Sequence, residues 1–338
     1  MRTNGLNAFK RECASTMSDD KHSSTDGFLT QEYEEWMSRL PEELWDIPLS
    51  NLAIPGSHDA MSYCLDMKSP MVQSQPILIR LLDRLFRCFS RPVILRWATT
   101  QHKSIGDQLH MGIRYFDLRI ARKPHDSSNY LFFTHVIYSH LSVLETLASV
   151  ATWLESHPRE VVILSCSHFE GMSAKVHESF ILSLRKLFGS KLCPRMEAVP
   201  TLRSLWSNRW QVLLSYEDQS AARYPELWPA IPYWWANQPT AQGVINYLDG
   251  RKAMGRPDGL FVSGLNLTTN LCFMVLEWDQ SLRTLSQENW DQLSVWLQKQ
   301  TPGYSLQSLN IIAGDFVGPI PFCPLVIALN QRFLLHTK

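Results

Sequence analysis

The chain has 338 residues, of which 45% are hydrophobic, so a large core can be buried. This length is too great for one minimal domain, but it suits one α/β barrel of roughly 250 residues with extensions. Lys plus Arg and Asp plus Glu number 32 each, so no overall field draws the protein to nucleic acid.

Cysteine usage and targeting signals bear on the compartment. Seven cysteines are scattered through the chain without a Cys-x-x-Cys pair. This spacing is typical neither of a structural zinc site nor of a disulfide framework, and reduced thiols are the simplest interpretation. No apolar segment is long enough to span a bilayer, and the chain does not start with the apolar run of a secretory signal. We therefore expect a cytoplasmic protein.

The chain divides into a tail and one domain. Residues 1–28 are polar and rich in Ser, Thr and Asp, which predicts a disordered tail. One domain is expected over residues 29–338, with order beginning near Thr30, which can cap a short helix. Strand-like segments rich in Val, Ile, Leu and aromatic residues follow, as expected for strands buried on both faces. They are Leu49–Ile54, Ile113–Ile120, Tyr130–His135, Val161–Ser165, Gln211–Ser215, Leu260–Leu265 and Leu309–Ala313.

Helix-like segments alternate with these strands. Ser142, with Glu145 three residues later, has the pattern of a capping box and predicts a helix start. Apolar residues recur at helical spacing over residues 144–154, 176–187 and 290–297. No repeat separates two domains, so the alternation predicts a closed parallel barrel or a doubly wound sheet.

Ionisable residues follow the expected strands. Side chains at the same end of successive barrel strands converge in space. A histidine with an adjacent acid and a neighbouring arginine supplies proton transfer and anion stabilisation, which phosphodiester cleavage needs. These residues are His58-Asp59, Asp117 and Arg119, His135, Ser167-His168, Tyr216-Glu217-Asp218 and Gly314-Asp315.

The chain resembles the phosphatidylinositol-specific phospholipase C X-domain family, and more closely its small eukaryotic X-domain-containing members. The resemblance runs from about Trp36 to about Leu335, and the blocks around His58-Asp59 and Asp117/Arg119 are its most specific part. It rests on Asn51–Asp59, Gly112–Arg119, Phe133–His135, Val161–Glu170, Leu202–Asp218 and Asn310–Val317.

The resemblance implies an irregular TIM-type barrel of the α/β class. It also implies a phosphoric diester hydrolase that cleaves phosphatidylinositol to diacylglycerol and a cyclic inositol phosphate. Two imidazoles in opposite protonation states suit that reaction, because histidine titrates near pH ~6.5 and serves both the nucleophile and the leaving group.

The resemblance also implies a role for each site residue. His58 would be the general base for the inositol 2-hydroxyl, and Asp315 would orient it. His135 would be the general acid for the diacylglycerol oxygen, supported by Asp59. Arg119 would stabilise the phosphoryl oxygens. Asp117 belongs to the network of Arg119, and a purely supporting role is at least as good an interpretation as direct chemistry.

Arg119 bears on the cofactor. In the large eukaryotic phospholipases C a calcium ligand occupies the corresponding place, whereas bacterial enzymes use arginine. A guanidinium here makes a metal ion redundant and electrostatically unfavourable. We therefore expect a calcium-independent enzyme without a cofactor.

The sequence departs from the family pattern at three positions. Val136 follows the expected acid where many relatives have glycine. Near Ser167 and Tyr216 bacterial enzymes have basic residues that contact inositol, and here the side chains are neutral. These departures keep a rival hypothesis open, an inositol-lipid binding module with little turnover. A metal-dependent phosphodiesterase for glycerophosphodiesters is a second rival.

Three further features have two interpretations each. His168, at a strand end, is either structural or part of the site. The stretch 77–96 combines apolar residues with arginines, which indicates either a basic amphipathic helix on an anionic membrane or a helix packed on the barrel. The aromatic segment 227–235 is either membrane-facing or, as we favour, packing.

Overall fold

One curled sheet runs through the part of the chain that the computed structural model describes, which is residues 33–336 except 125, 127, 129, 270–272, 275, 276 and 278. The tail predicted over residues 1–28 and the helix cap at Thr30 lie outside these residues. The strand order is β7-β6-β5-β2-β1-β10-β9-β8, and every neighbouring pair in this order is parallel. The strands are β1 (Ile54–Ser57), β2 (Tyr115–Ala121), β5 (Val162–Glu170), β6 (Val212–Tyr216), β7 (Leu227–Trp228), β8 (Tyr233–Trp234), β9 (Val262–Gly264) and β10 (Ile311–Gly314).

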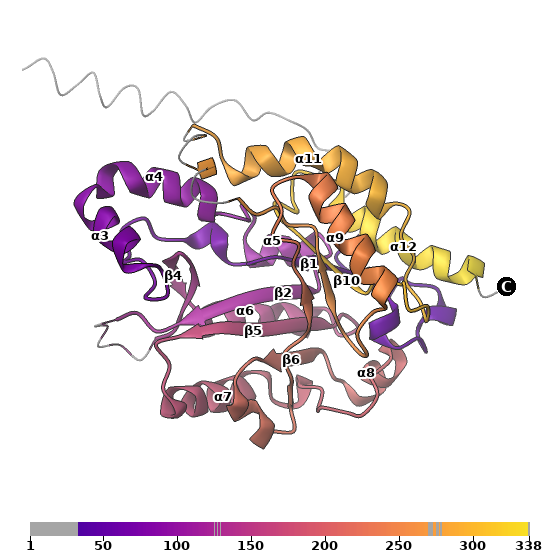
Figure 1. Cartoon of the computed structure of the whole chain (residues 1–338). Helices are drawn as coiled ribbons and strands as arrows, with labels where there is room; N and C mark the ends of the chain where they lie inside the picture. Colours follow the sequence, from indigo (N-terminus) through magenta and orange to yellow (C-terminus); the bar gives the residue numbers. More distant parts are fainter. Residues whose placement is uncertain are drawn as a thin grey trace, which may run out of the picture.

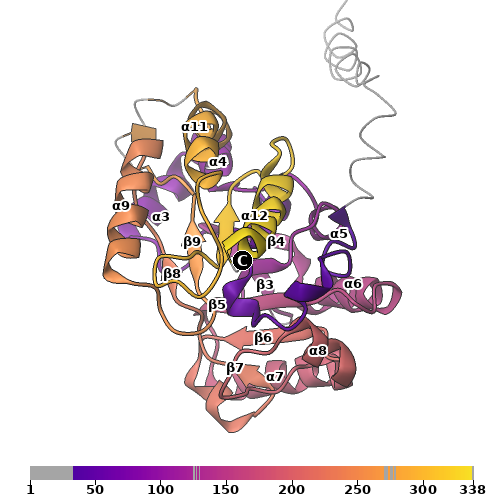
Figure 2. The ribbon, with the colours of Figure 1, turned by 90° about the vertical axis from the view of Figure 1, so that its right-hand side faces the viewer.

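Helices cover the outer face of this sheet (Figures 1 and 2), and the inner face encloses its own core cluster. The described part of the chain contains no helix with the length and apolar character needed to cross a membrane. The helices are α3 (Ile77–Leu85), α4 (Arg87–Ala98), α5 (Ile105–His110), α6 (Val143–Ser156), α7 (Ala174–Phe188), α8 (Leu202–Asn208), α9 (Ala241–Met254), α11 (Leu282–Leu297) and α12 (Phe322–His336).

The core has two parts because successive strand residues point to opposite faces. Phe116 and Leu118 of β2 belong to the cluster between sheet and helices, whereas Tyr115 belongs to the cluster inside the curl. The short strands β7 and β8 form the two edges of the sheet, so the barrel is irregular. They come from the aromatic segment 227–235, in which Trp228 and Trp234 are buried, as the packing interpretation expects.

The first expected strand begins later than predicted. Residues Leu49–Asn51 form a 3-10 helix after Pro48, and the strand begins at Ile54. The Nδ2 group of the buried Asn310 donates hydrogen bonds of 2.7 and 2.8 Å to the carbonyls of Leu49 and Leu52. A side chain thus satisfies backbone groups that a strand would satisfy through its ladder.

The expected strand Tyr130–His135 is not a barrel strand. Residues Phe132–His135 form β3, which pairs antiparallel with β2 and with β4 (Ile137–Ser142). The prediction of a strand ending at His135 is correct, but the parallel arrangement is wrong, since the chain turns back at Val136 instead of crossing through a helix.

The helix predicted from Ser142 is confirmed as α6, although its cap differs from a capping box. The Ser142 hydroxyl bonds the Glu145 carboxylate at 2.5 Å and makes no bond to a backbone N–H. The helices expected over 176–187 and 290–297 are α7 and α11.

The stretch 77–96 forms two helices rather than one. They are α3 and α4, joined at Phe86, and they stand together at one corner of the molecule (Figure 1). Arg91 is buried and pairs with the buried Asp83, with Nη2 2.6 Å from Oδ2, so this arginine does not point into water. The ion pair fixes α3 against α4.

Backbone strain is concentrated where strands end. Four non-glycine residues with positive φ lie at or next to expected site residues: Asp59 (39°), Val136 (67°), His168 (52°) and Phe316 (48°). Val136 is the most unfavourable case because its branched Cβ clashes in this left-handed region. A glycine at this position would adopt the conformation without that clash.

We predict that Val136→Gly is more stable than Val136→Ala by about 1 kcal/mol, because only glycine relieves a left-handed conformation that costs other residues roughly 1–2 kcal/mol. Urea unfolding of both variants measures the difference. His140, exposed on β4, is the matched control. There the ordinary order, alanine more stable than glycine, is expected. The same order at Val136 would contradict the strain argument.

Candidate active site

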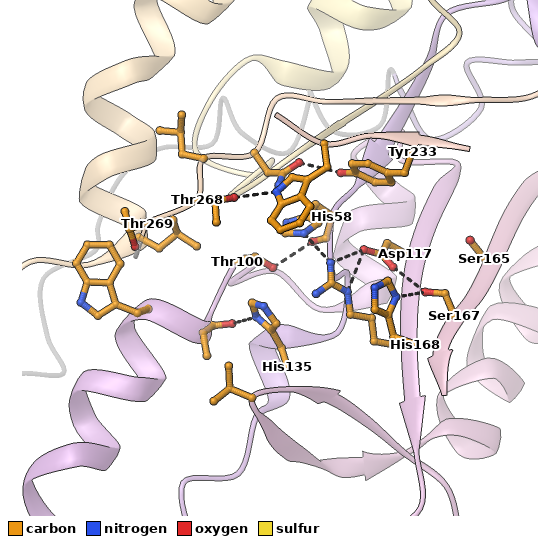
Figure 3. Close-up of a pocket in the computed structure, with 18 of the residues that line it drawn as sticks. His58, Thr100, Asp117, His135, Ser165, Ser167, His168, Tyr233, Thr268 and Thr269 are labelled. Carbon is orange, nitrogen blue, oxygen red and sulfur yellow. Dashed lines mark hydrogen bonds and ion pairs between the residues drawn. The ribbon is translucent and has the colours of Figure 1, made fainter. Parts of the chain in front are cut away.

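A pocket of about 540 Å³ opens at the carboxyl ends of the parallel strands. The inward positions of each strand are apolar near the amino end and polar near the carboxyl end. Along β5, for example, Ile163 belongs to the inner core, whereas Ser165 and Ser167 line the pocket. Figure 3 shows His58, His135, Asp117 and His168 around this cavity.

His58 comes directly after β1 and is held at both ring nitrogens. Its Nδ1 lies 2.7 Å from Oδ1 of Asp315, which follows β10, the neighbour of β1 in the sheet. Its Nε2 lies 2.8 Å from Nη2 of Arg119. A guanidinium only donates, so Nε2 must accept and the ring proton lies on Nδ1, which donates to Asp315. The two hydrogen bonds thus fix the tautomer of His58, with the Nε2 lone pair directed at Arg119 in the pocket.

His135 reaches the pocket from the β3–β4 hairpin. Its ring centroid lies 6.3 Å from that of His58, and the two planes are 79° apart. Nδ1 donates to the carbonyl of Ala98, the last residue of α4, at 2.6 Å and lies 3.0 Å from Oδ2 of Asp59. A helix carboxyl end and a carboxylate both favour an imidazolium.

Asp59 and His135 form a pair whose ionisation is suppressed. Burial raises the pKa of Asp59 to about 7, although Arg119 opposes this shift. Burial, reinforced by the positive charge of Arg119, lowers the pKa of His135 to about 3. In the folded protein the carboxyl group of Asp59 therefore holds a proton more readily than the ring of His135.

Arg119 and Asp117 form the second charged group. Nη2 of Arg119 lies 3.2 Å from Oδ2 of Asp117, and Nη1 lies 3.9 Å from Oδ2 of Asp59. Burial would raise the pKa of Asp117, but the Arg119 guanidinium together with smaller contributions, among them the backbone N–H of Asp59, outweighs burial and the pKa is lowered. Burial would likewise lower the pKa of Arg119, and Asp117 and Asp59 more than offset this and raise it. Asp117 also accepts from the backbone N–H of Asp59 at 3.1 Å, so it contacts both Arg119 and the backbone beside His58.

All six expected site residues therefore meet in one place. His58, Asp117, Arg119 and His135 line the pocket, and Asp59 and Asp315 lie directly behind the two imidazoles. His168 also lines the pocket; its Nδ1 lies 2.9 Å from the Ser167 hydroxyl.

The expectation that Tyr216 provides a neutral side chain to the pocket wall is wrong. Tyr216 is buried in the cluster between sheet and helices, where its hydroxyl bonds Nδ1 of His177 at 2.8 Å. The pocket residue is the next one, Glu217, whose Oε2 accepts from the backbone N–H of His168 at 2.7 Å. An acidic residue thus stands on this wall, not a neutral one.

Two residues that the sequence did not single out brace the site. The Nε2 group of Gln101 donates to the carbonyls of His58 at 3.1 Å and Gly314 at 2.9 Å. Thr100 donates from Oγ1 to the carbonyl of His58 at 3.1 Å. Together they tie the ends of β1 and β10, so that Asp315 stays against His58.

Tyr233 is a third residue that was missed. It lies at the start of β8, and its ring centroid is 6.3 Å from that of His58. Its hydroxyl donates to Oδ1 of Asn266 at 2.9 Å, and both residues line the pocket. The only signal for it was the aromatic segment 227–235, which gives no indication of which ring faces the site.

The positive charge of the site comes from the Arg119 guanidinium, and the surrounding side chains that the structure describes do not form a metal-binding group. Within the described ranges, no group of three or more His, Cys, Asp or Glu side chains has a metal-binding arrangement. The guanidinium of Arg119 already lies between the carboxylates of Asp117 and Asp59. A divalent ion beside it would face a fixed positive charge.

An irregular α/β barrel with this site defines a class of phospholipase-C-like folds. Solved structures support that class. A variant of the phosphatidylinositol-specific phospholipase C from Staphylococcus aureus superposes with a TM-score of 0.61 and 16% identity, covering 89% of this chain and 98% of that one. The enzyme of that name from Listeria monocytogenes gives 0.61 and 21%, covering 88% and 98%. These similarities confirm the predicted TIM-type barrel of the α/β class.

Sequence relatives are closer. PI-PLC X domain-containing protein 1 of Homo sapiens is 48% identical over 302 residues, which cover 89% of this chain and 93% of that protein. Its Danio rerio counterpart is 46% identical over 301 residues, covering 88% and 97%. Residues 93–244 match the family described as PI-PLC X 1. The chain belongs to the PI-PLC X domain-containing protein family, which confirms the resemblance found from the sequence.

We predict opposite pH dependences of stability for Asp59→Asn and His135→Ala. In Asp59→Asn, His135 keeps a lowered pKa, so between about pH 3 and 6.5 only the unfolded chain binds its proton. The free energy of unfolding then rises with pH. In His135→Ala, Asp59 keeps a raised pKa, so between about pH 3.8 and 7 only the folded chain binds its proton. The free energy of unfolding then falls with pH. One proton difference changes it by at most ~1.4 kcal/mol per pH unit.

Urea unfolding from pH 4.5 to 6.5 measures these slopes against the wild type, in which the two contributions cancel. His140→Ala removes an exposed imidazole from the same hairpin and is the control. Slopes of the same sign in Asp59→Asn and His135→Ala would refute the shared-proton description.

Proposed function

We propose that the protein is a phosphoric diester hydrolase that cleaves phosphatidylinositol. The inositol 2-oxygen forms a bond to phosphorus while the bond from phosphorus to the glycerol oxygen breaks. The products are a cyclic inositol phosphate and diacylglycerol. The observation that carries the proposal is the pair of imidazoles, His58 and His135, whose ring centroids are 6.3 Å apart in one pocket. Arg119 contacts the first of them.

His58 acts as the base in this proposal. Its Nε2 carries the lone pair, and Asp315 stabilises the positive charge that forms when the ring takes the 2-hydroxyl proton. In the structure Nε2 accepts from Arg119. A bound phosphodiester offers that guanidinium a stronger acceptor, so the base becomes free when substrate arrives.

His135 acts as the acid. With substrate absent its proton resides on Asp59, because the pocket disfavours an imidazolium. The negative charge of the phosphodiester raises the pKa of the ring, and the pair then holds its proton on His135. Nδ1 remains bonded to the Ala98 carbonyl, so Nε2 delivers the proton to the glycerol oxygen.

Arg119 supplies the positive charge for the phosphoryl oxygens, and Asp117 keeps it in place. This is the basis for proposing that no calcium ion is required. Arg119 is the only Lys or Arg among the described residues that line the pocket, and Glu217 stands on its wall. That wall suits a neutral polyol, and it also keeps a second candidate open, a headgroup-binding module with little turnover.

We predict that purified protein releases cyclic inositol phosphate from phosphatidylinositol vesicles and that a chelator does not reduce the rate. His58→Ala and His135→Ala should each lower the rate by roughly 10²–10⁴-fold, as expected for loss of general acid–base catalysis. Arg119→Ala should lower it by roughly 10²–10³-fold through lost charge stabilisation. Phosphorus NMR identifies the cyclic product.

His140→Ala, an exposed histidine on the hairpin that carries His135, is the matched control and should retain full activity. Binding of the lipid without product would favour the binding module. Activity abolished by the chelator would favour a metal-dependent phosphodiesterase.

We further propose that the protein docks on anionic membranes from the cytoplasmic side through α3 and α4. Seven apolar side chains on these helices are 48–75% exposed, and Arg84 is exposed among them. Exposed apolar residues in such a group indicate an interaction surface, and basic residues add attraction to anionic lipids. This apolar helix face comprises Ile77, Leu78, Leu81, Leu82, Leu85, Phe86 and Phe89.

We predict that the double variant Leu85→Glu/Phe89→Glu sediments at least tenfold less well with vesicles of phosphatidylserine and phosphatidylinositol. Each lost apolar side chain removes part of the ~1.5–3 kcal/mol that full burial gives. Met254→Glu, a change of an equally exposed apolar residue on α9, is the control. Unchanged sedimentation of a folded double variant, checked by circular dichroism, would rule out this surface.

A further inference from the structure

The pocket has two chemically different ends. The polar end carries the ionisable groups. The apolar end is built by the segment before α3, the inner sides of α3 and α4, and the turn of the β3–β4 hairpin. Its members are Met71, Ile79, Ile94, Trp97 and Val136.

The apolar end is a formed part of the protein interior. Met71 is 6% and Trp97 5% exposed. Ile79, Ile94 and Val136 are partly buried and pack in one cluster with Met71 and the buried Ala98 and Ile137. It therefore keeps its shape without a bilayer, unlike the exposed apolar helix face.

His135 marks the border between the two ends. Val136, the next residue in the chain, lines the apolar end. The carbonyl that accepts from His135 belongs to Ala98, the residue after Trp97, which also lines the apolar end. In Figure 3 His135 lies on the α4 side of the cavity, away from Asp117 and His168. The alcohol that His135 protonates must leave from this side.

We propose that the apolar end holds the glycerol and the first carbons of an acyl chain of the lipid, so that protein and not bilayer surrounds them during cleavage. This inference rests on the proposed function and adds a second binding element to it. The helices that build the apolar end also carry the apolar helix face on their outer sides. The remainder of the chain can thus pass from the pocket directly into the membrane.

The consequence is a dependence on acyl-chain length that needs no membrane. Each buried methylene strengthens binding by about fourfold. Wild-type protein should therefore cleave monomeric dihexanoyl-phosphatidylinositol with a kcat/KM at least tenfold above that for the dibutanoyl lipid, both below their aggregation concentrations. Glycerophosphoinositol has the same phosphodiester without acyl chains and should be the poorest substrate of the three.

Ile94→Trp fills the apolar end and should lower the ratio of kcat/KM for the dihexanoyl lipid to kcat/KM for glycerophosphoinositol at least tenfold. Leu182→Trp, which adds the same ring to an exposed position of α7, is the matched control and should change neither. Ile79→Asn makes the same end polar without filling it and should likewise lower that ratio.

Equal kcat/KM for the two wild-type monomeric lipids would overturn the inference and leave the proposed function standing. So would a chain-length gain that survives in both folded variants. A wild-type protein that cleaves none of the three substrates would instead refute the proposed function itself.

Discussion

One half-buried guanidinium holds the charges of the site together. Arg119 donates to His58 and lies beside Asp117 and, more distantly, Asp59. Removal of Arg119 leaves the buried carboxylate of Asp117 without its counter-charge, which is more costly than loss of a surface ion pair. The charge balance around both pocket imidazoles therefore depends on this one side chain. It also explains why Asp117, which accepts from Arg119 and from the backbone of Asp59, is best understood as a positioning residue.

The parallel strands were predictable because burial on both faces produces apolar runs, and polar residues at their carboxyl ends follow from the barrel. That reasoning located His58, Arg119 and Asp315 correctly. It erred by one residue at β6, because alternation makes neighbours face opposite sides, and Glu217 rather than Tyr216 faces inward.

The direction of the strand at His135 and the roles of Gln101 and Thr100 had no signal in the sequence. His135 was located correctly although its strand was assigned the wrong direction, since a hairpin and a barrel strand have the same apolar pattern over four residues. Gln101 and Thr100 donate hydrogen bonds to the backbone carbonyls of His58 and Gly314. Every residue type has a backbone carbonyl, so the sequence does not show which ones accept these bonds. Their role depends on where the chain passes in space, which spacing along the sequence does not encode.

The low tendency of His135 to hold a proton, compared with Asp59, is explained by the position of His135 between the polar and the apolar end of the pocket. A permanent imidazolium at the border of an apolar wall would be poorly solvated, and it would lie close to Arg119. A neutral carboxylic acid stores the same proton without charge. In the proposed reaction the anionic phosphodiester supplies the counter-charge when the ring has to act as an acid. Under that proposal an acid can lie next to the apolar end because its charge forms only after the lipid has entered.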